Sequence, residues 1–189
     1  MGSSPASASE FAFPASFLPL ALQCLVSARF MALQLQVPVA GNLFHHAVEF
    51  FLKEAVAHRV PVSRLASRKL GHDLEALWRE FKVEHTKADE SLFPIVATLN
   101  RFEDIRYPVA GEVQGPQLHL AIFRHPEGKS MGAPSAYALV LEDVDHLLQH
   151  IVSQTRLDGI LKMTVGQLPS ASRQALTESN RHLLLGCAT

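Results

Sequence analysis

Histidine and carboxylate side chains at helical spacing are the residues of this 189-residue sequence with the plainest capacity for chemistry. His45 lies four residues before Glu49 and His46 lies three residues before it, so each histidine is within reach of the carboxylate on a helix. His146 and His150 are also one helical turn apart. Two ligands on one face hold a metal ion only weakly, and a zinc site needs a third protein ligand. No His-Glu-x-x-His pattern is present to supply one. We therefore predict no metal site and no cofactor, with His146 and His150 as solvated side chains.

Several other chemistries and locations are disfavoured by the sequence. It contains no phosphate loop, dinucleotide fingerprint or serine-hydrolase elbow. The formal net charge of −1 provides no bulk attraction to nucleic acid or acidic membranes. The apolar stretch 17–26 resembles the core of a signal peptide, but no lysine or arginine precedes it, Pro19 interrupts it, and it is too short to span a bilayer. Cys24 and Cys187 lack the spacing of a metal site or a disulfide framework. We expect a cytoplasmic protein without a membrane partner.

One amphipathic helix over about residues 42–58 is expected to organise the fold. His45, Glu49 and Lys53 fall on one face of this helix, where Glu49 can pair with Lys53. Its other face is a wide apolar stripe, which other helices must cover because it cannot remain in water. The residues of this stripe recur at steps of three and four: Phe44, Ala47, Val48, Phe51, Leu52, Ala55 and Val56. A second helix over 72–85 would bury Leu74, Leu77, Trp78 and Phe81.

The remaining segments predict an all-α antiparallel bundle of five or six helices in a single domain over residues 15–189, after a disordered N-terminus over 1–14. Glycines and prolines between Pro108 and Pro134 interrupt the helices, and we interpret 108–134 as an irregular insertion. The run 118–123 has strand length and is expected to form a flap or part of a small hairpin. The other helices are expected at about 17–36 (ended by Pro38 and Gly41), 92–107, 137–154 (ended by Gly159) and 170–185.

A candidate ligand-binding site combines His72, Asp73, Arg106 and Tyr107. The turn over 86–91 is short, so the helices before and after it should run antiparallel as neighbours. The start of one helix then lies at the same end of the bundle as the finish of the other, and Arg106 should come within reach of Asp73 or His72. Asp73 could instead only cap a helix, and Arg106 could be a buried tether to a carboxylate.

Three short patches resemble the HEPN domain, a family of helical bundles. They are the run Asn42 to Lys53, the run Lys69 to Leu74, and Arg106-Tyr107-Pro108, and the resemblance in order and spacing covers roughly residues 15–157. It implies one of two functions. Some HEPN proteins are metal-independent ribonucleases that use an arginine and a histidine a few residues later. Others lack this pair and serve as binding or partner modules, sometimes beside a nucleotidyltransferase.

The ribonuclease pattern has a single match in this chain, from Arg79 to His85. In that chemistry the histidine moves the proton of the ribose 2′-OH and the arginine steadies the phosphate charge. Glu80 and Glu84 lie beside the pair and would repel RNA phosphate. We therefore favour a non-catalytic HEPN-like module, a homodimer that binds a nucleotide, another small ligand or a nucleotidyltransferase-type partner. The alternative is a metal-independent endoribonuclease of a toxin–antitoxin or defence system, with RNA as its substrate.

Overall fold

Two long antiparallel helices, α1 (Leu18–Leu33) and α2 (Val37–Val56), form the centre of this computed structural model. Leu35 turns the chain between them with a φ of 59°, in the left-handed region. The structure describes residues 16–67, 70–102, 120–124, 137–155 and 157–182, so the predicted disordered N-terminus lies outside the described residues.

Pro38 and Gly41 were expected to end the first helix, but both lie inside the first turns of α2. A proline is tolerated there because the first N–H groups of a helix have no intrahelical partner. Gly41 faces the buried ring of Phe102, and a Cβ placed on it would lie only 2.0 Å from Phe102 Cδ1. Gly41 is therefore required by close packing against Phe102 and does not end a helix.

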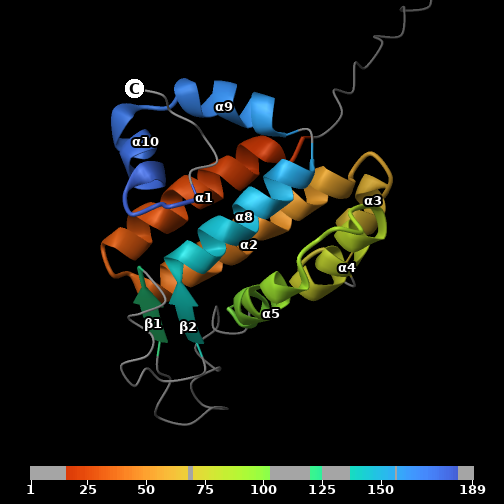
Figure 1. Ribbon diagram of the computed structural model, residues 1–189, viewed down its shortest axis with the longest axis horizontal. Coiled ribbons are helices and arrows are strands. Elements are labelled where there is room, and N and C mark those ends of the chain that lie inside the picture. Colours follow the sequence, from red (N-terminus) through yellow and green to blue (C-terminus); the bar gives the residue numbers. More distant parts are fainter. Residues whose placement is uncertain (1–15, 68–69, 103–119, 125–136, 156, 183–189) are drawn as a thin grey trace, which may run out of the picture.

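Three helical segments follow α2, and the second and third of them pack on the side of α2 that faces away from α1 (Figure 1). They are α3 (Val62–Leu65), α4 (Leu74–Glu84) and α5 (Phe93–Arg101), with a short 3-10 turn η1 (Glu90–Leu92) before α5. The predicted apolar stripes of α2 and of α4 are buried, which confirms the helical spacing used to identify them.

Two short strands, β1 (Leu120–Phe123) and β2 (Tyr137–Val140), pair in parallel at one end of the helices. Of the two predicted alternatives, a flap or a small hairpin, the hairpin is therefore wrong, because a tight turn joins only antiparallel strands and a parallel pair needs a longer connection. The segment expected to be helical from 137 is instead β2 followed by helix α8 (Leu141–Gln154). Most of the predicted insertion 108–134 lies outside the described residues, but its strand-like part is confirmed.

The last two helices, α9 (Asp158–Gly166) and α10 (Ser170–Thr177), lie on the α1 side of the molecule (Figure 1). Gly159 does not end the preceding helix as expected, since α8 stops at Gln154 and Gly159 lies in the first turn of α9. Within the described part of the chain, no helix is both long and apolar enough to cross a membrane.

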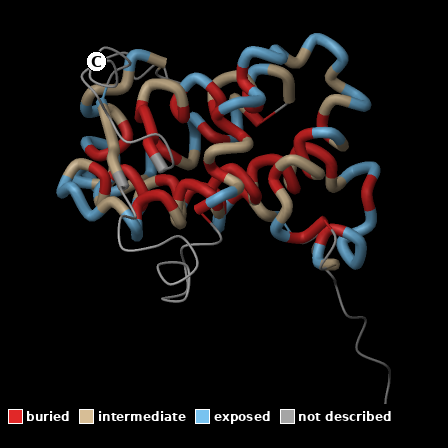
Figure 2. The backbone as a smooth tube through the Cα atoms, turned by 90° about the horizontal axis from the view of Figure 1, so that it is seen from below, coloured by how far each residue is buried: buried red, intermediate tan, exposed pale blue. Residues whose placement is uncertain are grey.

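One hydrophobic core runs through the molecule, with side chains from α1, α2, α4, α5, α8 and the C-terminal helices. Buried residues follow the central helices and exposed residues lie at the periphery (Figure 2). The predominance of helix confirms the all-α class, with the parallel strand pair as the exception. The described residues form eight α-helices rather than the predicted five or six, because the short helices α3 and α9 were not expected. The HEPN-like arrangement of the bundle stays a prediction.

Candidate functional site

Helix α2 carries a polar stripe through this apolar interior. His45, Glu49 and Lys53 follow one another at steps of four residues, and all three side chains are buried. Charged side chains are seldom fully buried unless they are paired. The stripe is therefore an exception to the rule that a protein interior is apolar, and its residues need partners.

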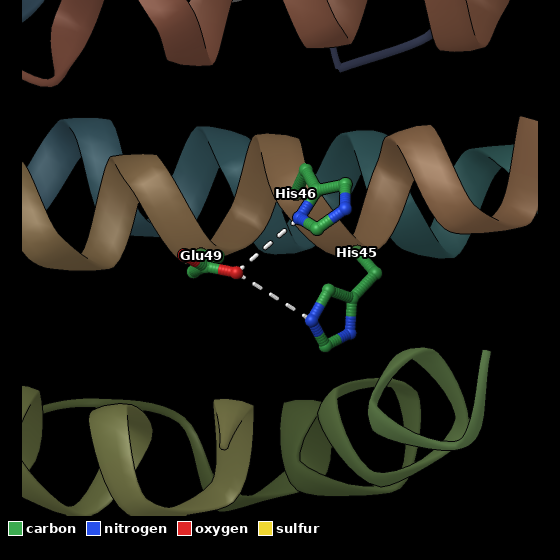
Figure 3. Close-up of side chains that lie close together, drawn as sticks. All are labelled: His45, His46 and Glu49. Atoms are coloured by element: carbon green, nitrogen blue, oxygen red, sulfur yellow. Dashed lines mark hydrogen bonds and ion pairs between the residues drawn. The ribbon is translucent and has the colours of Figure 1, made fainter. Parts of the chain in front are cut away.

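Glu49 is the centre of a polar cluster (Figure 3). Its Oε1 atom accepts a hydrogen bond from Lys53 Nζ at 2.5 Å. Its Oε2 atom lies 3.3 Å from His46 Nδ1 and 3.6 Å from His45 Nε2. His45, His46 and Glu49 lie within about one turn of α2, so helix geometry brings their side chains within reach of one another.

A further imidazole comes from another part of the chain. His72 lies just before α4, and its Nδ1 atom is 3.2 Å from Glu49 Oε2. The His72 side chain is 56% exposed, whereas that of Glu49 is 1% exposed. His72 thus connects the buried carboxylate with the surface. We refer to His45, His46, Glu49, Lys53 and His72 as the Glu49 cluster.

Neighbouring elements fix two members of the cluster. His45 Nδ1 lies 3.1 Å from the Leu99 carbonyl oxygen of α5 and must be the donor, because a carbonyl oxygen only accepts. The Lys53 ammonium lies 5.6 Å from the centre of the Phe50 ring and 5.8 Å from that of Phe17. Cation–π attraction therefore adds to its ion pair with Glu49.

The electrostatics of the cluster keep Glu49 ionised. Burial is the largest single influence and raises the pKa of the Glu49 carboxyl. The interactions of Glu49 with His45, His46 and Lys53, together with the Lys53 charge, outweigh burial and hold the pKa of Glu49 well below its usual range. The result is a permanent carboxylate surrounded by imidazole nitrogens, an arrangement able to bind a cation through nitrogen and oxygen atoms.

The predicted site at His72 and Asp73 is divided between two roles. His72 contacts Glu49, as described above. Asp73 is the N-cap of α4, and its Oδ1 atom accepts a hydrogen bond from the Ala76 backbone N–H at 3.0 Å. Arg106 and Tyr107 lie outside the described residues, so the predicted approach of Arg106 to Asp73 or His72 stays a prediction.

Arg79 and His85 do not converge on one site within the chain. Arg79 lies on an exposed part of α4, where its Nε donates to the Glu75 carbonyl, and it borders a cleft with Arg64 and Glu80. His85 instead borders a separate cleft of about 600 Å³. Its ring lies against Phe81, with ring centres 4.4 Å apart, and burial is the main cause that lowers its pKa.

His146 and His150 also contact different partners rather than forming one site. The ring of His146 is stacked on that of His182, with centres 4.7 Å apart. His150 Nε2 instead accepts a hydrogen bond from the Asp89 backbone N–H at 3.3 Å. In the ranges that the structure describes, the single group of three donor side chains close enough to share a metal ion is His45, His46 and Glu49.

The pairs of His45 and His46 with Glu49 follow from the sequence, but their contact with His72 was not predicted. The predicted ion pair of Glu49 with Lys53 is confirmed. The sequence does contain a signal that this polar row is buried. Apolar residues of α2 lie on both sides of the row formed by His45, Glu49 and Lys53. A polar row flanked on both sides by buried positions must itself be buried and partnered.

Comparisons of the chain with protein-family models, with curated proteins and with solved structures found no match. Fold and site together define a mostly helical protein with a buried histidine–carboxylate–lysine cluster that reaches the surface at His72.

Proposed function

We propose that this protein is a non-catalytic, HEPN-like binding module of the cytoplasm and that its ligand binds at the Glu49 cluster. One observation carries the proposal: an ionised carboxylate inside the helical core is surrounded by imidazoles from two separate chain segments. Burying a charge costs several kcal/mol, and apolar residues in its place often give equal or greater stability. A cluster that adds little to stability is better explained by binding.

The endoribonuclease alternative has less support. Its chemistry needs a proton-transferring histidine and a phosphate-binding arginine at the same phosphodiester group. Arg79 and His85 border different clefts, and the carboxylates of Glu54 and Glu84 line the His85 cleft. These negative charges oppose the approach of RNA phosphate.

The test is an RNA cleavage assay. Purified protein is incubated with single-stranded RNA and with transfer RNA in the presence of a chelator, beside its His85→Ala and Arg79→Ala variants. We expect no cleavage by any of the three, while a commercial ribonuclease in parallel digests the same RNA. Cleavage by the unaltered protein that is lost in His85→Ala, with an unchanged circular dichroism spectrum, would replace the binding module with the ribonuclease.

The assembly that we propose for the module follows from its resemblance to the HEPN domain. We expect a homodimer held by helix contacts, able to act beside a nucleotidyltransferase-type partner. Light scattering at micromolar concentration and physiological salt tests the homodimer, and the mass of a single chain would contradict it.

A further inference from the structure

We infer that the Glu49 cluster binds one divalent transition-metal ion of the zinc type, through His45, His46 and Glu49, with His72 as the fourth ligand. This inference rests on the proposed function, since the metal ion would be the ligand of the binding module. It replaces the expectation that the chain has no metal site. The reason is that α2 supplies three ligand side chains at close distance, and the fourth, His72, meets them only in the folded chain.

The distances from Glu49 Oε2 to the three imidazoles fit the edges of a tetrahedral site. Zinc binds nitrogen and oxygen ligands at about 2.0–2.2 Å, so neighbouring ligand atoms of a tetrahedral site are about 3.3 Å apart. Glu49 Oε2 lies 3.6 Å from His45 Nε2, 3.3 Å from His46 Nδ1 and 3.2 Å from His72 Nδ1. One donor atom from each of His45, His46 and Glu49 lies within 4.8 Å of the other two. His72 lies outside this group, so its exposed side chain must turn toward His45 and His46 to become the fourth ligand.

Hydrogen bonds to neighbouring groups already orient two of the proposed ligands, His45 and Glu49. His45 donates its Nδ1–H to the Leu99 carbonyl, which leaves the lone pair of Nε2 directed at Glu49. A backbone carbonyl that fixes a histidine tautomer in this way is the usual outer contact of a metal-binding histidine. Lys53 holds Oε1 of Glu49 and leaves Oε2 for the ion, although its positive charge lowers the affinity of the site.

The donor set selects the class of metal. Imidazole nitrogens with one carboxylate oxygen suit zinc and related transition ions, whereas magnesium and calcium prefer oxygen ligands alone. His72, half exposed at the rim, provides both the adjustable fourth ligand and the route by which an ion enters. His45 and Glu49 have the i, i+4 spacing by which helices commonly present two metal ligands.

The experiment uses full-length protein freed of metal by a chelator. Zinc affinity is measured by competition with a chromophoric chelator, and cobalt(II) is added to a second sample as a spectroscopic probe. We expect one ion per chain and the intense visible absorption of a four-coordinate cobalt site. His46→Ala and His72→Ala remove side chains that are partly exposed, so the fold should persist. Each should weaken zinc binding at least about tenfold.

Glu49→Gln should weaken zinc binding as well, and His146→Ala is the matched control. His146 is an exposed histidine of the stacked pair with His182, outside the proposed site, so its loss should leave zinc affinity unchanged. Circular dichroism confirms that each variant is folded.

Two results would overturn the metal site: no stoichiometric binding, or equal affinity in the unaltered protein, His46→Ala and His72→Ala. If zinc does not bind and RNA is not cleaved, the metal inference alone fails. If RNA cleavage depends on His85, the proposed function fails whether or not zinc binds.

Discussion

At the scale of single residues, the neighbours His72 and Asp73 have different tasks. The Asp73 carboxylate closes the first turn of α4, and Asn100 assists it by accepting the Leu74 backbone N–H at 2.9 Å. The His72 side chain instead contacts Glu49 on α2. The contact with Glu49 makes His72 a candidate for binding, whereas the contacts of Asp73 describe a helix cap.

We predict that Asp73→Ala lowers the free energy of unfolding by about 1 kcal/mol, the usual cost of losing an N-cap. Asp73→Ser keeps an oxygen acceptor for the Ala76 N–H and should retain most of the stability. Urea denaturation of both variants gives these values. Because the cap is separate from the Glu49 cluster, zinc affinity should be the same in both. A loss of affinity without a loss of stability would return Asp73 to the binding site.

At the scale of elements, His150 joins α8 to the turn that precedes α5. Its Nε2 atom accepts the Asp89 backbone N–H, and its ring lies 6.2 Å from that of Trp78 on α4. Burial is the main cause that lowers the pKa of His150 below its ordinary value of 6.5. The charges of His146 and His85 lower it further, and that of Asp89 opposes them. A proton on Nε2 would also remove the acceptor for the Asp89 N–H.

This geometry predicts a loss of stability in mild acid. Below pH 6.5 the unfolded chain binds a proton at His150 more readily than the folded chain does. The free energy of unfolding therefore decreases as the pH is lowered below 6.5. We expect a lower urea midpoint at pH 5.5 than at pH 7.5.

His150→Gln should make this loss shallower, because the glutamine oxygen can accept the same N–H and does not titrate. Some loss should remain, since the pKa values of His85 and His182 are also lowered, mainly by burial. Asp145 opposes this loss, because burial raises its pKa to about 6 and the folded chain then binds that proton more readily. An unchanged pH dependence in His150→Gln would contradict the role of His150.

At the scale of the whole molecule, Arg29 of α1 ties the C-terminal helix to the core. Its Nη1 atom donates to both oxygens of Asp145 on α8 at 2.5 Å. Its Nε donates to the Ala175 carbonyl of α10 at 2.7 Å, and Nη2 donates to the Glu178 carbonyl at 2.6 Å. Arg29 and Asp145 are both buried, and one guanidinium joins α1, α8 and the end of α10.

We predict that Arg29→Met lowers the free energy of unfolding by about 3–5 kcal/mol, because it leaves the Asp145 carboxylate buried without its cation. The double variant Arg29→Met with Asp145→Leu removes both charges and should be clearly more stable than the single variant. Chemical denaturation of the four proteins of this cycle gives the coupling. Equal stability of the single and double variants would mean that burial of the charge is not the cause.

The sequence by itself determined the apolar buried faces of α2 and α4. The apolar residues of α2 and α4 were identified from their spacing alone, and all of them lie in the core. Helix periodicity is a local property, since residues three or four apart share a face whatever the rest of the chain does. The ion pair of Glu49 with Lys53 and the capping alternative for Asp73 were predictable for the same reason.

Only the tertiary structure decided what those faces meet. His72 is 23 residues from Glu49, and their contact depends on how the start of α4 lies against α2. The same holds for Gly41, which is required inside a helix because the ring of Phe102 packs on it, and for the parallel pairing of β1 with β2. These contacts join segments far apart in the chain. They are set by the packing of the whole core, which no local sequence pattern records.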